Sequence, residues 1–340
     1  MPTQVMESIF SRARDAKRHI ILPEGDDPRV QRAGIQAAAT CLADITLIGN
    51  AQAIQSVIAA EATEGARPTV VDASDNADFD ALTNALHDLR AHRGMTAQEA
   101  RRQIADPVMQ AAMRVRLGMA GGTVGGAVNT TAHIVRTALQ LIGRAQGVNT
   151  VSSFFLMVPP AYHPTMDSAV IFSDCGLVVA PDAAQLAEIG ISAANTASAL
   201  LDVTPQVAFL SFSTAGSAEH PALATVREAV AMARTHAPHL QIDGEFQFDT
   251  AFDDTVRAKK APNSTLDRRP DVFVFPDLAA GNIGYKIAER IGGLRAVGPI
   301  LQGLAKPAND LSRGCCVDDI IAAIAITALQ VEDAVAATPD

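Results

Sequence analysis

His19-Ile20-Ile21-Leu22, then Asp27-Pro28, then Ile45-Thr46-Leu47-Ile48 before Gly49-Asn50 form the stretch that decides the fold. The two apolar runs predict short buried strands, and Gly49-Asn50 marks the turn after the second strand. Asp27 is a good N-cap and Pro28 suits the first position of a helix, so we expect a helix from there to about Leu42. A strand, a helix and a second strand in this order predict a parallel sheet covered by helices on both faces.

The same alternation continues along the chain and predicts an α/β protein of two domains. Further strands are expected around 70–71, 152–158, 169–172, 207–212, 240–242 and 272–275, and helices at 81–93, 96–104, 125–142, 183–200, 222–234, 281–291 and 317–331. The pattern restarts after a break at 143–149, and the Gly- and Pro-rich segment 298–307 marks a second boundary. We therefore expect domain I to comprise 1–148 plus 300–340, and domain II to comprise 149–299.

Length and composition restrict the class of protein. The 340 residues are enough for two domains with full cores, and 48% hydrophobic with 19% charged residues is the balance of a globular protein. The formal charge of −10 is spread without a block of one sign, which argues against nucleic-acid binding. Binding of an anionic substrate would therefore depend on local arginines.

Nothing at the N-terminus predicts a targeting signal, and no run approaches the roughly 18 apolar residues of a membrane span. The four cysteines, Cys41, Cys175, Cys315 and Cys316, lack metal-binding spacings. The histidines show no HxxxH or HExxH pattern, so we expect no metal site. A cytoplasmic enzyme with reduced thiols is the simplest interpretation.

The most informative motif is Asn309-Asp310-Leu311-Ser312-Arg313-Gly314-Cys315-Cys316-Val317-Asp318-Asp319. It places a hydroxyl, a fixed cation and two carboxylates on a Gly-containing loop that leads into a helix. Arg313 suits a phosphate or a carboxylate, but it is also placed to pair with Asp310 or Asp318. Asp319 lies off the apolar stripe in the first turn of the helix, where a carboxylate also stabilises the helix N-terminus.

Three further arginines are candidates to converge on the same site. Arg90 ends an expected helix, Arg29 follows the helix cap, and Arg136 lies about 100° off the apolar stripe of its helix. That stripe comprises Val128, Ala132, Val135, Leu139 and Ile142. A single arginine of this kind is more often solvated or salt-bridged than a ligand, and Ser312 is equally compatible with a turn hydroxyl. Together the arginines supply the cations that two polyanionic substrates require.

Two segments rich in glycine or hydroxyl groups lie at the ends of expected elements. Gly118–Gly126 fits neither a GxGxxG fingerprint nor a P-loop, and we interpret it as the flexible start of a helix. Ser211–Ser217 follows a strong strand, so its hydroxyls and glycine could bind a phosphate at the carboxyl end of that strand. It contains no GxSxG elbow, which argues against a Ser-His-Asp hydrolase.

In their order these motifs resemble the phosphate acetyltransferase (phosphotransacetylase) family nearly end to end. The matching segments are Leu22-Pro23-Glu24 with Arg29; Leu89-Arg90 with Arg93-Gly94-Met95-Thr96; 124–139; Phe172-Ser173-Asp174-Cys175; Leu210-Ser211-Phe212-Ser213-Thr214; 243–249; 260–264; 275–278; and 281–319. A series of motifs in a fixed order is far more specific than any one of them. The resemblance implies two three-layer α/β/α domains with a cleft between them, similar to the isocitrate/isopropylmalate dehydrogenase-like fold.

The resemblance also implies the reaction, in which acetyl phosphate and coenzyme A (CoA) are reversibly converted to acetyl-CoA and phosphate. By motif, Asp319 resembles the general base for the thiol and Arg313 the residue that binds the phosphoryl group. Ser312 resembles a hydroxyl that assists at the thiol and the transition state. Substrate binding is expected for a larger set, which comprises Arg29, Arg90, Arg136, Ser213, Thr214, Lys286 and Asn309.

The family resemblance further implies a homodimer that uses CoA as a substrate and needs no cofactor. We see no extra N-terminal domain, so we expect the short form of the enzyme. The sequence departs from the family pattern at Gly121, Gly125 and Asn129, where Asp, Ser and His are common, and at Thr137, where Pro is frequent. These departures surround an expected substrate-side helix and leave the acyl preference open.

Three other functions are compatible with parts of this pattern. A sibling enzyme that prefers butyryl phosphate would differ only in pocket shape, and such a preference amounts to about 1–3 kcal/mol. A non-catalytic acetyl-CoA-sensing domain would not need Ser312, Arg313 and Asp319. A metal- and nicotinamide-dependent decarboxylating dehydrogenase would need an aspartate cluster that the sequence lacks.

Overall fold

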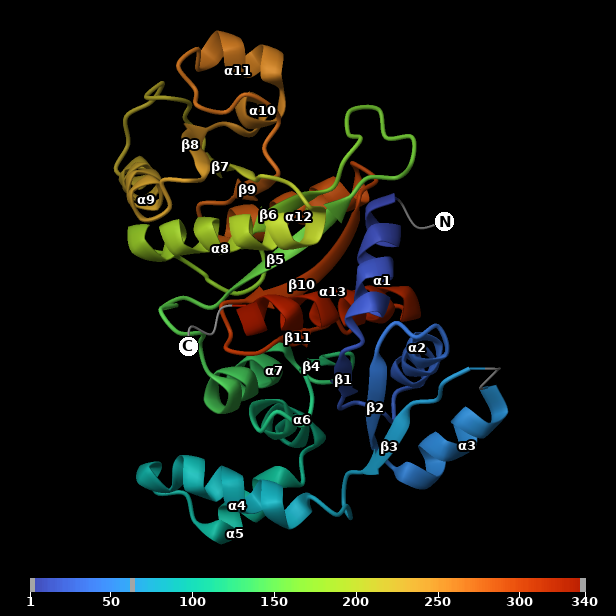
Figure 1. Cartoon of the computed structure of the whole chain (residues 1–340). Coiled ribbons are helices and arrows are strands. Elements are labelled where there is room, and N and C mark those ends of the chain that lie inside the picture. The colour runs from blue at the N-terminus through green and yellow to red at the C-terminus, as the bar shows by residue number, and fades with distance from the viewer. Residues whose placement is uncertain (1–3, 62–64, 337–340) are drawn as a thin grey trace. The chain divides into compact units, whose positions relative to one another are not determined.

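The computed structural model describes residues 4–61 and 65–336, with side chains described as far as Val331. Its contacts divide the chain into two compact units, whose elements are labelled in Figure 1. Unit 1 is Gly147–Gly303 with Met1–Val5, and unit 2 is Met6–Gln146 with Leu304–Asp340. The domain limits expected from the sequence remain predictions. Within the described residues, no helix is long and apolar enough to cross a membrane.

Unit 2 is built on a five-stranded sheet in the order β11-β4-β1-β2-β3, in which every pair is parallel. The strands are β1 (His19–Leu22), β2 (Asp44–Gly49), β3 (Thr69–Asp72), β4 (Gly122–Gly125) and β11 (Ala308–Asp310). The strand–helix–strand start expected from the sequence is confirmed, because β1 pairs with β2 in parallel and helix α2 (Pro28–Ala39) connects the two strands. The side chain of the N-cap residue Asp27 accepts a hydrogen bond from the Arg29 amide.

Helices cover both faces of this sheet. Gly34 of α2 lies against Leu22 and Leu47 on one face, while Ile21 shares an apolar cluster with Leu86 and Met113 on the other. The helices outside 147–303 are α1 (Gln4–Ala16), α2, α3 (Ala51–Glu61), α4 (Phe79–Arg90), η1 (Ala91–Arg93), α5 (Ala97–Ile104), α6 (Pro107–Arg116), α7 (Thr131–Thr137), η2 (Ala138–Ile142) and α13 (Val317–Ala336).

The helix expected at 125–142 is wrong at its N-terminal end. Gly122–Gly125 forms β4, and α7 begins only after a loop. The segment Gly118–Gly126 therefore contains a strand and is not the start of a helix. The expected apolar stripe is broken, because Val128 and Leu139 are 58% and 41% exposed. The small residues of β4 pair with β1 and β11, which are distant in sequence, so local periodicity does not reveal this strand.

Unit 1 is built on a six-stranded sheet in the order β10-β5-β6-β9-β7-β8. The strands are β5 (Ser152–Val158), β6 (Val170–Ser173), β7 (Gln206–Leu210), β8 (Gln241–Phe246), β9 (Val272–Val274) and β10 (Arg295–Gln302). Strands β6, β9, β7 and β8 pair in parallel, whereas β5 joins β6 and β10 in antiparallel pairs. The sequence does not predict β10, because Gly298-Pro299 is typical of a turn. A register shift between Val297 and Ile300 accommodates these two residues within the strand.

Helices cover both faces of the unit 1 sheet as well. The ring of Phe209 packs against Gly190 of α8, where an added Cβ would lie 2.5 Å from the ring. Its neighbours Ala208 and Leu210 point to the opposite face, in a cluster with Tyr285 of α12. The helices of unit 1 are α8 (Ala183–Leu201), α9 (Ala222–His236), α10 (Phe248–Phe252), α11 (Asp254–Lys260) and α12 (Leu278–Arg290). Each unit is therefore a sheet between two layers of helices.

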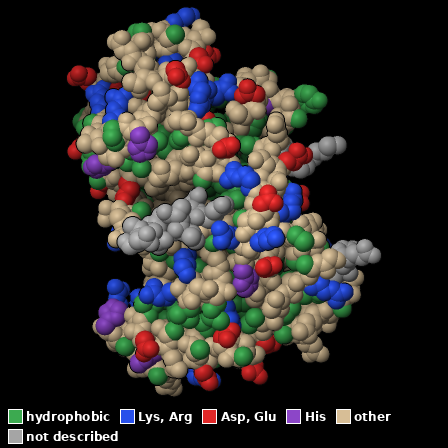
Figure 2. Space-filling view, in the orientation of Figure 1, with side chains coloured by type: hydrophobic (Ala, Val, Ile, Leu, Met, Phe, Trp, Pro, Cys, Tyr) green, Lys and Arg blue, Asp and Glu red, His purple; other side chains and the backbone are tan. Residues whose placement is uncertain are grey.

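Charged side chains of both signs are interspersed on the face of the molecule shown in Figure 2. In the face shown in Figure 2, Lys and Arg lie among Asp and Glu on both units. This matches the sequence, in which 27 basic and 37 acidic residues give a formal charge of −10 without long runs of one sign.

Candidate functional site

The candidate site is centred on the loop 311–316, which connects β11 to α13. The Leu311 amide donates to the Gly125 carbonyl at 2.7 Å and so extends the β11–β4 pairing by one residue. The Cys315 amide then donates to the Ser312 carbonyl and closes a turn. Ser312 and Arg313 are exposed on this turn, whereas Cys315 is buried. The 311–316 loop therefore presents a hydroxyl and a guanidinium to solvent just before a helix begins.

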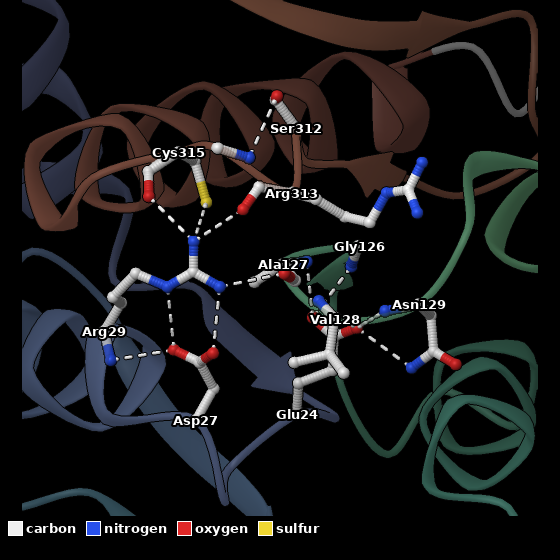
Figure 3. A network of polar contacts seen from close by, with 11 residues as sticks. Glu24, Asp27, Arg29, Gly126, Ala127, Val128, Asn129, Ser312, Arg313 and Cys315 are labelled. Carbon is white, nitrogen blue, oxygen red and sulfur yellow. Dashed lines mark hydrogen bonds and ion pairs between the residues drawn. The ribbon is translucent and has the colours of Figure 1, made fainter.

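Arg29 fixes the backbone of this loop, as Figure 3 shows. Its guanidinium donates to both oxygens of Asp27, at 3.0 and 2.9 Å. It also donates to the carbonyls of Arg313 at 2.8 Å, Cys315 at 3.0 Å and Ala127 at 2.9 Å. These contacts use all five N–H groups of an arginine. The same pair lowers the pKa of Asp27, mainly through the side-chain hydrogen bond.

Glu24 fixes the neighbouring loop 126–129. Its carboxylate accepts hydrogen bonds of 2.7–3.1 Å from the four consecutive backbone amides of this loop, and one of 2.9 Å from the Asn129 side chain. Consecutive amides of this kind form a concave nest for an anion, and here the nest holds the protein's own carboxylate (Figure 3). Gly126 has a φ of +106°, and a Cβ there would lie 2.2 Å from Asp310 Oδ1, so this position requires glycine.

Asp310 is a buried carboxylate immediately before the 311–316 loop. It is 1% exposed, and its Oδ2 accepts a hydrogen bond from the Thr131 hydroxyl at 2.6 Å. Its Oδ1 has no hydrogen-bond partner among the described residues. Burial, assisted by the nearby charge of Glu24, raises the pKa of Asp310 to about 6. The site thus contains a carboxyl group that changes its charge close to neutral pH.

Asp319 lies in the first turn of α13 and accepts a hydrogen bond from the Cys316 amide at 3.0 Å. This contact is the helix-stabilising arrangement that the sequence allows. The same oxygen also accepts the Cys316 thiol at 3.2 Å, so the carboxylate is placed to receive a proton from a thiol. The adjacent Cys315 differs, because burial raises the pKa of its thiol to about 11.

The side chains of Ser312 and Arg313 extend from the fixed loop. Within the described residues, the Arg313 guanidinium makes no hydrogen bond or ion pair, and it lies outside the dashed network of Figure 3. The pairing with Asp310 or Asp318 that the sequence allows is therefore not formed. The Ser312 hydroxyl accepts a hydrogen bond of 3.3 Å from the Gly314 amide, which is a turn contact. An exposed guanidinium beside a helix N-terminus is well suited to a phosphoryl group.

The other expected site residues of unit 2 divide into two kinds. Arg90 is the last residue of α4 and Arg136 lies exposed on α7, and neither guanidinium has a partner in the part of the chain that the structure describes. Asn309 is fully buried, and its amide donates to Thr327 at 2.8 Å and to Gln330 at 2.7 Å. The structure thus ties Asn309 to α13, and it leaves Arg90 and Arg136 outside the network around Arg29.

Ser213 and Thr214 of unit 1 are buried at 0% and 3% exposure, so their hydroxyls do not reach solvent. Ser213 donates to Glu245 at 2.8 Å, and Thr214 accepts from the Gln247 amide at 3.0 Å. Lys286 is exposed on α12, where its ammonium group lies on the Tyr285 ring. The sequence pattern correctly placed these hydroxyls after a strand, but it could not show that they turn inward.

Glu245 explains why the Ser213 hydroxyl turns inward. Burial opposes ionisation of this carboxyl, but hydrogen bonds from Arg227, the Gly216 amide and Ser213 outweigh it and lower its pKa to about 2. The Arg227 guanidinium lies 2.9 Å from the Glu245 carboxylate. The loop after β7 is therefore held by an internal anion, which occupies the Ser213 hydroxyl, while the Gln247 amide occupies the Thr214 hydroxyl.

Sequence reasoning gave no role to Glu24, Asn129 or Asp310, which complete the site. Glu24 belongs to one of the motifs that match the family. Its position just after β1 could have indicated a site residue, since groups at the carboxyl ends of parallel strands converge. Nothing in the sequence shows that Asp310 is buried. Among the described residues, no group of three or more His, Cys, Asp or Glu is placed to hold a metal ion. The catalytic and substrate-binding roles of the expected residues remain predictions.

The fold and the loop define a class of protein: an α/β protein that gathers a hydroxyl, an exposed cation and a carboxylate where a strand of a parallel sheet leads into a helix. The chain belongs to the family described as Phosphate acetyl/butaryl transferase, which matches residues 4–328. It is 55% identical over 325 residues to a phosphate acetyltransferase of Paracoccus denitrificans, an alignment that covers 96% of this chain and 98% of that protein. It is 42% identical over 327 residues to one of Acetivibrio thermocellus, with 96% and 98% covered.

Solved structures agree with this assignment. A phosphotransacetylase from Streptococcus pyogenes superposes with a TM-score of 0.89 at 38% identity, over 96% of this chain and 99% of that one. One from Staphylococcus aureus gives 0.86 at 37% identity, with the same shares covered. A 4-hydroxythreonine-4-phosphate dehydrogenase from Klebsiella pneumoniae gives 0.53 at 14% identity, over 92% and 98% of the two chains, which shows a likeness of fold alone.

Proposed function

We propose that this protein is a phosphate acetyltransferase, which reversibly converts acetyl phosphate and CoA to acetyl-CoA and phosphate. Support comes from its membership of the family and from 55% identity to a relative with that activity in its name. The structural observation that carries the proposal is the 311–316 loop with the start of α13. There three groups lie within eight residues: the Arg313 guanidinium, which has no partner among the described residues, the Ser312 hydroxyl and the thiol-accepting Asp319 carboxylate.

In the proposed reaction, Asp319 takes the proton of the CoA thiol while the sulfur attacks the acetyl carbonyl. The C–S bond forms, the C–O bond to phosphate breaks, and phosphate leaves. An ordinary thiol and an ordinary aspartic acid differ in pKa by about 4.6 units, so complete proton transfer beforehand would cost about 6 kcal/mol. We therefore expect proton removal to be concerted with attack. The contact between the Cys316 thiol and Asp319 supports this role, because it places a thiol at 3.2 Å from the same carboxylate.

Arg313 would bind the phosphoryl group and stabilise the charge that develops on the leaving phosphate, while Ser312 would assist at the thiol. Arg90 and Arg136 carry unpaired guanidinium groups within the described residues, which suits them for the phosphates of CoA. The contacts of Arg29, Asn309, Ser213 and Thr214 favour positioning roles for these residues instead. No cofactor takes part in the proposed reaction, since CoA is a substrate.

The proposal also covers the domain architecture, the location in the cell and the oligomeric state. We expect the two compact units to correspond to the two domains, and the likeness to a dehydrogenase fold is compatible with the isocitrate/isopropylmalate dehydrogenase-like architecture. We expect a cytoplasmic protein. We also expect a homodimer, since Ile283, Ile287 and Ile291 form a stripe along α12 and its C-cap that is 58%, 52% and 83% exposed. An apolar stripe of this kind commonly marks a protein–protein contact.

The activity is tested by mixing the purified protein with acetyl phosphate and CoA and following the ultraviolet absorbance of the thioester. We expect Asp319→Asn to lower kcat by about 10²–10⁴-fold with a much smaller change in the KM for CoA. Arg313→Ala should lower kcat/KM for acetyl phosphate by about 10²-fold or more. Asp318→Asn is the matched control, because Asp318 is exposed in the same helical turn and should leave turnover unchanged.

Three outcomes would contradict this proposal in different ways. Equal losses in Asp318→Asn and Asp319→Asn would remove Asp319 as the base. Turnover of butyryl phosphate in preference to acetyl phosphate would make the protein the sibling acyltransferase. Binding of acetyl-CoA without turnover of either acyl phosphate would favour a sensing domain.

The homodimer is tested by sedimentation of the protein and of Ile287→Asp. A charge in the middle of the apolar stripe should shift the mass from two chains to one at micromolar concentration. Leu117→Asp is the control, because Leu117 is 48% exposed on unit 2. A single-chain mass for the unmodified protein would contradict the expected dimer.

A further inference from the structure

Unit 1 contains a pocket of about 610 Å³, and no step of the proposed reaction is assigned to it. Its volume lies within the range of about 300–1,000 Å³ that is typical of small-molecule sites. The pocket is lined by residues that follow β7 and β9 and by the first turns of α9 and α12. None of the residues assigned to acetyl transfer lines it.

The pocket lies where the topology of the sheet predicts a ligand site. Strands β9 and β7 are parallel neighbours. The chain leaves β7 through α9 towards β8, but it leaves β9 through α12 towards β10 at the opposite edge. The connections therefore diverge at the carboxyl ends of two adjacent strands and open a crevice between them. Crevices at such switch points are where open α/β sheets bind their ligands.

The walls of the pocket are aromatic. Phe212 follows β7 and is 57% exposed, Phe248 begins α10 and is 44% exposed, and the buried Phe275 follows β9. Two partly exposed phenylalanines in one concave site leave apolar surface in contact with water. A flat aromatic ligand would cover that surface and stack on the rings.

The polar groups of the pocket select the kind of ring. The hydroxyls of Ser211 and Thr225 have no hydrogen-bond partner within the described residues. Asp277 caps α12, because its Oδ1 accepts a hydrogen bond of 2.8 Å from the Ala280 amide. The described residues that line the pocket include Asp277 but no Lys or Arg, so the charge they supply is negative and a free phosphate is disfavoured. The remaining carboxylate oxygen is an acceptor for an N–H group, such as an exocyclic amine.

From these observations we infer that the pocket binds the adenosine group, an aminopurine nucleoside. The purine stacks against Phe212 and Phe248, its amino group donates to Asp277, and a free ribose hydroxyl pairs with Ser211 or Thr225. Adenosine occurs in free adenine nucleotides and, with a phosphate on its 3′ oxygen, at the end of CoA. Both sources share this recognition of the purine and a ribose hydroxyl, and in both the phosphates lie outside the pocket. The inference needs only the pocket, so it stands or falls separately from acetyl transfer.

The chain contains no tryptophan, so Phe212→Trp creates a single fluorescent reporter at the pocket. We expect adenosine to quench it saturably, with a Kd on the order of 0.1 mM, the value that typical ligand efficiencies give for a molecule of this size. Calorimetry on the unmodified protein should give the same Kd. Phe212→Ala should weaken binding about tenfold through lost stacking. Tyr162→Ala is the matched control, since Tyr162 is 98% exposed and does not line the pocket.

Inosine tests the amino group, because it carries a carbonyl acceptor where adenosine carries the amine. We expect inosine to bind about fivefold more weakly than adenosine. Asp277→Asn should reverse this preference, since asparagine still caps a helix but adds a donor. Equal binding of inosine and adenosine, or no saturable quenching up to about 5 mM adenosine, would overturn the inference. So would equal affinities of Phe212→Ala and Tyr162→Ala.

Competition identifies the source of the adenosine. If the pocket takes the end of CoA, saturating CoA displaces adenosine, while pantetheine does not. If it takes a free nucleotide, adenosine still quenches in the presence of saturating CoA. Failure of the proposed enzyme activity alone would leave the quenching intact, so the two failures are distinguishable.

Discussion

The loops 311–316 and 211–217 each follow a strand in the parallel part of a sheet, and each contains serine and glycine. One loop exposes polar side chains, whereas the other exposes an apolar one. In the 311–316 loop of unit 2, Arg29 holds the backbone carbonyls and Ser312 and Arg313 face solvent. In 211–217 of unit 1, an internal carboxylate holds the Ser213 hydroxyl and the Phe212 side chain is exposed. Which side chains are available to a substrate therefore depends on what the fold places behind the loop.

The buried carboxylates near these loops differ in the same way. Glu245 is buried but receives hydrogen bonds from Arg227, Gly216 and Ser213, and these lower its pKa to about 2. Asp310 has one oxygen without a partner among the described residues, and burial raises its pKa to about 6. Two acids of nearly equal exposure, 3% and 1%, thus sit on opposite sides of their ordinary values. At Glu245 the donors, Arg227 among them, outweigh the cost of burial, whereas at Asp310 burial outweighs the donors.

Among the residues that hold these two loops in place, the largest expected effect comes from removing the Arg29 guanidinium, which fixes the 311–316 loop. Arg29→Ala should lower kcat by about 10²-fold, because a misplacement of about 1 Å at the reacting groups has that consequence. It should also lower the free energy of unfolding by about 2–4 kcal/mol, since Asp27 loses its ion pair. Thioester formation and urea denaturation measure the two effects.

Arg32→Ala is the control for this prediction, because Arg32 lies on the same helix and its guanidinium forms an exposed pair with Glu61. Whether Arg29 positions the loop or binds substrate is decided by whether Arg29→Ala changes kcat or KM. A positioning residue lowers kcat with little change in KM. A rise in KM at unchanged kcat would show that Arg29 binds substrate after all.

The next effect concerns Asp310 and the pH dependence of stability. Its folded-state pKa of about 6 lies above the ordinary 3.8, so ionisation destabilises the fold as pH rises through 6. The shift corresponds to roughly 3 kcal/mol at most. We expect Asp310→Asn to gain stability relative to the unmodified protein between pH 4.5 and pH 8, by up to that amount.

Glu245→Gln is the counterpart with the opposite sign. The pKa of Glu245 is lowered, so its stabilising contribution is present above about pH 4.5 and is lost as pH falls towards 2. Urea denaturation at pH 3, 5 and 8 measures both variants. A pH-independent difference between Asp310→Asn and the unmodified protein would show that Asp310 does not titrate in this range.

The smallest expected effects are those of replacing Ser312 and Ser213, and the two should differ in kind. Ser312→Ala should lower kcat by about tenfold, because its hydroxyl is exposed beside Arg313. Ser213→Ala should leave the kinetic constants unchanged and lower the free energy of unfolding by about 1–2 kcal/mol, because Glu245 loses a donor. An increase in the KM for acetyl phosphate in Ser213→Ala would show that the buried hydroxyl becomes accessible during the reaction.

Local sequence was a good guide where the pattern is local. The apolar runs after Arg18 and before Asn50 predicted β1 and β2, and Asp27-Pro28 predicted the start of α2. It failed for β4, which begins and ends with glycine, and for β10, which contains Gly298-Pro299. Both strands are formed by pairing with partners distant in the chain, so no window of the sequence contains their cause.

The sequence by itself determined the α/β alternation, the family and the set of chemical groups on the 311–316 loop, because these depend on residue type and order. Only the tertiary structure decided how the groups are used. It turned Ser213 and Thr214 inward, saturated the guanidinium of Arg29, and left Arg313 unpaired among the described residues. It also set Asp310 and Glu245 on opposite sides of their ordinary pKa. The physical reason is that hydrogen bonds and burial depend on neighbours in space, which a linear pattern does not specify.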